Sequence, residues 1–248
     1  MKKARNISAL LLAVVLTLAL GISAMAAPVA PSGITVKQVY DFTSLPNGDT
    51  TDTALGFWNP TEGGSTNVNV NNGVITFASD HWGAFTNFTK DQMNILKKSD
   101  GWGFYFKAGN DDAAVTMGFN GANGGNHVLA TGKPVILCPL SGEPQNVKTE
   151  FSEGFNQGII IVPAGFEGYI YIPFNAYIVN DGSNAAFDVT VNPPATPIYV
   201  LGLGAPAGFG EIVAYSEGPQ GTADLSVVAY AAAAVTGLGS LLFIRKRK

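Results

Sequence analysis

Flat aromatic side chains with a few polar neighbours are the residues of this 248-residue sequence whose types suggest ligand chemistry. Indole and phenol rings stack on the apolar faces of sugar rings, while nearby amides, carboxylates and amines bond to the hydroxyl groups. The candidate glycan-binding residues are Trp58, Trp82, Tyr105, Lys107, Tyr169 and Tyr171. For each aromatic residue taken alone, packing in a core or a loop is the competing interpretation.

Acidic side chains form a second set of candidates, because Ca²⁺ prefers oxygen ligands from carboxylates, amides and carbonyls. We expect Asp41, Asp49 and Glu211 to contribute to a structural calcium site, with Asp52 as a further donor. No EF-hand spacing is present, so solvated acids in loops are the alternative. Structural Ca²⁺ is the only cofactor that the sequence suggests.

The sequence lacks the compact motifs that accompany common catalytic centres. It contains no Gly-x-Ser-x-Gly elbow and no His-Glu-x-x-His zinc motif, and the glycine-rich stretch 121–125 is interpreted as a turn. A glycosidase needs two carboxylates across a cleft, and Glu150 could be paired with Glu153 or with Glu143. The spacing of these residues does not favour a glycosidase centre. We therefore predict no catalytic residues, and a polysaccharide-degrading enzyme is the less favoured alternative.

The single cysteine, Cys138, cannot form an internal disulfide. It lies in an apolar run, where a small buried hydrophobic residue is expected. A nucleophilic thiol would need a basic partner, and the only histidines are His81 and His127.

Short apolar segments separated by Gly, Asn and Pro must position these candidates. This pattern predicts an all-β sandwich or barrel. Asn71-Asn72-Gly73 predicts a tight hairpin, and Thr89 is the expected cap of a helix over 89–98. The expected strands are 35–42, 68–70, 74–77, 82–88, 101–108, 113–120, 134–140, 158–162, 168–173, 187–191, 198–203 and 211–215.

Alternation along two of these strands assigns side chains to faces. In 101–107, Trp102, Phe104 and Phe106 share the face expected in the core, and Tyr105 and Lys107 share the other. In the strand over 168–173, the two isoleucines are expected to face inward. Its two tyrosines, at 169 and 171, are then expected to face outward.

The two ends of the chain indicate export and anchoring. Residues 1–26 have the layout of a signal peptide, with basic residues, an apolar run and a small-residue cleavage site. After a lead-in (27–34) and the domain, a linker (218–224) precedes an uncharged apolar run over 225–244, long enough for one transmembrane helix. The basic residues 245–248 would stay in the cytoplasm, which places the domain outside the cell.

The charge balance of the domain disfavours one class of partner. Seven of the 14 basic residues lie in the two ends, which leaves seven against 17 of the 18 acidic residues and a net charge of −10. Such an acidic domain is a poor binder of phosphate backbones, so nucleic acid is not an expected partner.

The segment 162–174, Val-Pro-Ala-Gly-Phe-Glu-Gly-Tyr-Ile-Tyr-Ile-Pro-Phe, resembles a signature of jelly-roll, carbohydrate-binding-module-like domains in Gram-positive surface proteins. There a Pro-Ala-Gly-Phe turn leads into a strand that ends in Ile-Pro-Phe. The resemblance implies that residues 35–217 form a β-sandwich domain of jelly-roll type. The C-terminus resembles a Gram-positive cell-wall sorting signal, with 219–224 as a degenerate motif. Cleavage at Thr222 and a retained transmembrane anchor are the two alternatives.

Together, the residues and the resemblance lead to an expected function. The chain is expected to be a non-catalytic glycan-binding protein, held by its C-terminus at the outer side of the membrane or in the cell wall. Its expected partners are a polysaccharide and the membrane or wall. The alternative is a structural or adhesive surface protein that contacts other proteins or the wall.

Overall fold

The computed structural model describes residues 28–61, 63–183, 185–202 and 206–218. The predicted signal peptide, transmembrane segment and basic tail lie outside the described residues. Within those ranges, no helix has both the length and the apolar character needed to span a membrane. The described residues form two antiparallel sheets with few helices, as expected for an all-β sandwich.

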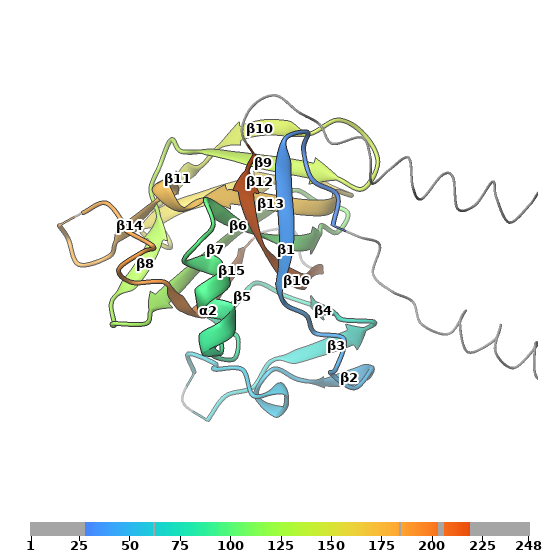
Figure 1. Ribbon diagram of the computed structural model, residues 1–248. Helices are drawn as coiled ribbons and strands as arrows, with labels where there is room; N and C mark the ends of the chain where they lie inside the picture. The colour runs from blue at the N-terminus through green and yellow to red at the C-terminus, as the bar shows by residue number, and fades with distance from the viewer. Residues whose placement is uncertain (1–27, 62, 184, 203–205, 219–248) are drawn as a thin grey trace, which may run out of the picture.

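The larger sheet has nine strands and contains both ends of the described domain (Figure 1). Its strands are, in spatial order, β10 (Gln145–Lys148), β9 (Pro134–Pro139), β13 (Glu167–Pro173), β6 (Gly101–Lys107), β16 (Ala207–Glu217), β4 (Val74–Phe77), β3 (Asn67–Asn71) and β2 (Gly48–Thr51), with β1 (Ile34–Tyr40) also paired to β16. Because Ile34 pairs with Glu217, the first and last strands lie side by side.

The smaller sheet has seven strands and carries the exposed Trp82, while the exposed Trp58 is bridged to its edge strand from outside the sheet. Its main path is β11 (Glu150–Ser152), β12 (Gln157–Val162), β7 (Ala113–Gly121), β15 (Pro194–Gly202) and β5 (His81–Ala84), while β8 (Asn126–Leu129) pairs with both β7 and β14 (Tyr177–Val179). The remaining elements are the α-helix α2 (Lys90–Leu96) and the 3-10 helices η1 (Thr53–Leu55) and η2 (Phe174–Ala176).

The hydrophobic core lies between the inner faces of the two sheets. Trp102 from β6 is 1% exposed, and its Nε1 donates to the hydroxyl of Tyr177 at 2.7 Å. That hydroxyl donates in turn to the carbonyl of Met117 at 2.5 Å. The polar atoms that these large side chains bring into the core are therefore paired, which avoids the cost of burying them alone.

Three local predictions are confirmed. Asn72 and Gly73 have φ of 48° and 79° and form the tight turn between β3 and β4. Thr89 caps α2 in a capping box with Gln92, whose Nε2 also donates to the carbonyl of Val39 at 2.8 Å. A turn at Pro163 leads into β13, because the amide of Phe166 donates to its carbonyl at 3.1 Å.

Several strand predictions are wrong. Residues 187–191 form no strand, and β5 ends at Ala84 rather than at 88. Strands β2, β8, β10, β11 and β14 were not expected, since each has three or four residues and is too short for a clear alternation. These short strands extend the margins of both sheets.

Candidate functional site

Trp58 and Trp82 lie together on the surface, at the edge of the smaller sheet formed by β5. Their side chains are 54% and 42% exposed, and the two rings meet edge to face with centroids 5.3 Å apart. Large aromatic residues are usually covered, and a contact between two exposed indoles buries part of each ring against the other. The pair is the most prominent exposed aromatic feature in the described part of the chain.

Backbone pairing fixes Trp58 beside β5. The amide of Trp58 donates to the carbonyl of Ala84 at 2.8 Å, and the amide of Ala84 donates back at 3.0 Å. Between Trp82 and Ala84 stands Gly83, where a Cβ would lie 2.6 Å from the carbonyl oxygen of Trp58 and 2.7 Å from the hydroxyl of Tyr199. A residue without a side chain is therefore required for this close approach.

Replacing Gly83 by alanine is expected to separate the two tryptophans. The added methyl group meets backbone on one side, so the Trp58 segment must move away from β5 and lose its two hydrogen bonds. We expect a change in the tryptophan fluorescence and near-UV circular dichroism at 25 °C. As a control, Gly154→Ala should leave both spectra unchanged, because a Cβ at Gly154 would lie 4.0 Å from its nearest neighbour, the hydroxyl of Ser152. Identical spectra for all three proteins would contradict the packing described here.

A buried carboxylate, that of Asp52, contacts residues next to both tryptophans. Asp52 is 0% exposed, and its Oδ1 accepts the backbone amides of Thr53 at 2.7 Å and Thr66 at 2.8 Å. Its Oδ2 accepts Asn59 Nδ2 at 2.8 Å and lies 3.0 Å from Nε2 of His81. A buried acid needs such partners to offset its lost hydration.

This carboxylate connects the two segments that carry the tryptophans. Asn59 follows Trp58 in the chain, and His81 precedes Trp82. Asp52 therefore binds a neighbour of each tryptophan and holds both segments in one arrangement. The sequence offered Asp52 only as a further metal donor, and its role depends on contacts between residues up to 29 positions apart.

A groove of about 320 Å³ begins at Trp82 and crosses the outer face of the smaller sheet. Its size falls in the range of small-ligand sites. Apolar surface comes mainly from Trp82, Phe155, Val128, Ile198 and Val200, and side-chain amides come from Asn126, Gln157 and Asn180. The groove thus combines flat apolar surface with groups that both donate and accept hydrogen bonds.

Most residues that line the groove carry no signal in the sequence, because strand pairing brings them together. Trp82 pairs with Val200 across β5 and β15, and Ile198 pairs with Gly118 across β15 and β7. Residues opposite one another share a face, so pairing gathers them from distant segments. The one local signal was Phe155, a 38% exposed aromatic residue in a polar loop.

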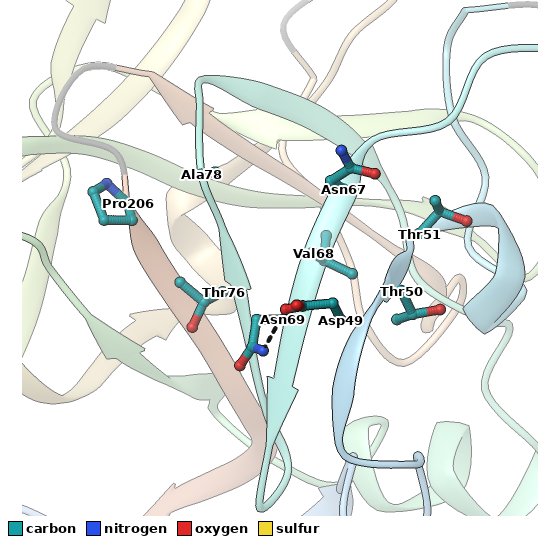
Figure 2. A pocket seen from close by; sticks show the side chains of 9 residues that line it. All are labelled: Asp49, Thr50, Thr51, Asn67, Val68, Asn69, Thr76, Ala78 and Pro206. Carbon is teal, nitrogen blue, oxygen red and sulfur yellow. Dashed lines mark hydrogen bonds between the residues drawn. The ribbon is translucent and has the colours of Figure 1, made fainter.

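A second concavity, of about 490 Å³, lies over β2, β3 and β4 (Figure 2). It is lined by small polar side chains, among them Thr51, Asn67 and Thr76, and by Asp49, which accepts a hydrogen bond from Asn69 at 2.8 Å. No aromatic side chain lines it among the residues described. It therefore lacks the flat surface that sugar stacking requires.

The three tyrosines of the predicted glycan site lie on the expected face of the sheet, but they are buried. The prediction that they bind a ligand is therefore corrected. Tyr105, Tyr169 and Tyr171 lie on the outer side of the larger sheet, yet they are only 6%, 1% and 0% exposed. Alternation specifies a face, but not what covers it. Here Val29 and Ala30 of the lead-in pack against this cluster.

Each of these tyrosine hydroxyls has a partner. Tyr105 donates to Glu167 at 2.6 Å, Tyr169 donates to Glu211, and Tyr171 donates to the carbonyl of Val29 at 2.8 Å. Burial, reinforced by the neighbouring carboxylates, raises the pKa of Tyr105 and Tyr169 well above its ordinary value. The phenols thus act as neutral donors within the fold.

Lys107 also belongs to this other face. Its Nζ lies 2.9 Å from Oε2 of Glu167, and both side chains remain substantially exposed. The six predicted ligand residues therefore divide between the outer faces of two different sheets. Of the exposed aromatic candidates, Trp58 and Trp82 contact each other, and Trp82 lines the groove.

The three predicted calcium ligands have separate partners. Asp41 Oδ1 accepts the amide and the hydroxyl of Thr43, at 3.0 and 2.6 Å, in a local turn. Glu211 is 3% exposed and also accepts Gln38 Nε2 at 2.8 Å. Asp49 lines the second concavity, and the described residues contain no group of three or more His, Cys, Asp or Glu placed to hold a metal ion. Calcium binding stays a prediction without a defined site.

Both histidines are largely buried, which makes stability depend on pH. Burial lowers the pKa of His81, outweighing the opposing effect of the Asp52 carboxylate, and burial also lowers the pKa of His127. His127 is 2% exposed and stacks on Phe119 at 4.7 Å. Both side chains are therefore harder to protonate in the folded protein than in the unfolded chain.

The urea midpoint is expected to fall as the pH drops from 7.5 to 5. At pH 7.5 the histidines are mostly neutral in both states, whereas toward pH 5 the unfolded chain binds more protons than the folded chain because its histidine pKa values are higher. The stability lost in this window should be smaller in His127→Gln, because one of the two groups no longer titrates. A midpoint that stays constant or rises toward pH 5 would contradict the burial of the histidines.

Comparisons with known proteins identify no family for this chain. No protein-family model matches it, and a search of curated proteins returns no significant match. The groove beside Trp58 and Trp82 is thus characterised by its own geometry.

Proposed function

We propose that this chain is a non-catalytic glycan-binding protein that holds a polysaccharide in the groove beside Trp58 and Trp82. The observation that supports this most is the exposed indole pair at the end of a groove with three side-chain amides. Indole faces stack on sugar C–H surfaces, and amides match the mixed donors and acceptors of hydroxyl groups.

The fold and the chain ends give this proposal its setting. We interpret the two-sheet sandwich as a jelly-roll, and the sequence of the two ends favours export and anchoring at the surface of a Gram-positive bacterium. A glycan site on the outer face of a sheet would then be open to wall or environmental polysaccharides.

Affinity electrophoresis with the full chain, kept in mild detergent because of its apolar ends, tests the proposal. Native gels containing soluble polysaccharides, each at several concentrations, are compared with a gel without polysaccharide. At least one polysaccharide should retard the protein in proportion to its concentration. A glycan array extends the search to short and branched ligands.

Two results would contradict the proposal. One is the absence of both retardation and array signal across all glycans. The other is retardation that persists unchanged when both tryptophans are replaced, since binding would then lie elsewhere. Release of reducing sugar from a retarding polysaccharide would point to the hydrolase alternative instead.

A further inference from the structure

The groove that begins at Trp82 has an uncharged lining. Of the described residues that form it, none is Asp, Glu, Lys, Arg or His. Its polar groups are the amides of Asn126, Gln157 and Asn180. Amides bond well to hydroxyl groups, but they supply no net charge to a carboxylate, sulfate or phosphate.

Basic residues are also scarce in the domain as a whole. The sequence has arginine only at positions 5, 245 and 247, so the domain contains none. Arginine is the side chain best suited to bind carboxylate or phosphate in a bidentate manner. Of the seven lysines of the domain, Lys107 is engaged with Glu167 on the outer face of the other sheet.

The chain next to the groove is acidic instead. Glu153 adjoins the lining residue Gly154, Asp181 adjoins Asn180, and Asp80 lies two positions before Trp82. The domain as a whole has a net charge of −10. An anionic polymer would therefore approach against a repulsive field and lose hydration without gaining a cationic partner.

We infer that the groove binds uncharged polysaccharides and rejects polymers that carry carboxylate, sulfate or phosphate groups. This inference rests on the proposed function, and it names the ligand class of the same groove. Affinity then comes from stacking and amide hydrogen bonds, which salt screens little, rather than from attraction between charges.

The test compares neutral and anionic polymers with the full chain in detergent. Mixed-linkage β-glucan, galactomannan and dextran serve as neutral probes, polygalacturonate and hyaluronan as anionic ones, and chitosan as a cationic one. Each is titrated at 20 mM and at 500 mM NaCl. Wild type is compared with Trp82→Ala and with Asn126→Ala, which removes one amide.

We expect at least one neutral polymer to bind with an affinity that changes less than threefold between the two salt concentrations. Both variants should weaken that binding by about tenfold or more, and the anionic polymers should not bind even at 20 mM NaCl. Binding of an anionic polymer, or of chitosan alone, that is lost in Trp82→Ala would overturn this inference and leave glycan binding intact. Failure of every polymer to bind would instead remove the proposed function itself.

Discussion

Trp82→Ala is expected to lower the affinity for the bound polysaccharide by about 2–3 kcal/mol, roughly 30- to 150-fold, as for a central tryptophan of a binding site. Trp82 lines the groove and contacts Trp58, so the variant loses both its own stacking surface and the support for the second ring. Isothermal titration calorimetry with the polysaccharide found by electrophoresis measures the change.

A matched control comes from another exposed aromatic residue. Phe151 is 54% exposed on β11 and does not line the groove, so Phe151→Ala should change the affinity less than twofold. Because Trp82 is 42% exposed, its removal should cost little stability, and the melting temperatures of both variants should stay close to that of wild type. Equal losses of affinity in the two variants would contradict the assignment of the groove.

Asp52→Ala is expected to reduce the free energy of unfolding by about 3–5 kcal/mol, because it leaves several buried donors without an acceptor. The backbone amides of Thr53 and Thr66 lose their acceptor, as do the side chains of Asn59 and His81. Urea unfolding followed by circular dichroism at pH 7.5 measures the difference. If the variant does not fold, Asp52→Asn keeps one acceptor oxygen and should show a smaller loss.

The control lies three residues away. Asp49 is exposed and accepts one hydrogen bond from Asn69, so Asp49→Ala should change stability by no more than about 0.5 kcal/mol. Partial folding of the Asp52 variant should also weaken glycan binding, since the segments of both tryptophans lose their common partner. Similar stability in the two alanine variants would show that the buried carboxylate is not needed.

Local signals in the sequence predicted much of the fold because their physical causes are local. Asn72-Gly73 supplies the positive φ of a tight turn, and Thr89 with Gln92 closes the first turn of α2. Alternation placed Trp102 inside and put the tyrosines of β13 on the other side. Such patterns failed for 187–191, where apolar Phe187 and Val189 pack against the core without forming a strand.

The sequence by itself determined which side chains could stack on sugars, which faces of the strands β6 and β13 turn inward, and that the domain is acidic. Only the tertiary structure decided which aromatics are accessible. Tyr169 and Tyr171 are covered by a distant segment, whereas Trp58 and Trp82 meet through pairing with β5 and a shared buried carboxylate. The reason is physical: periodicity along a strand reports one face, but burial and the shape of a groove depend on what other segments place above it.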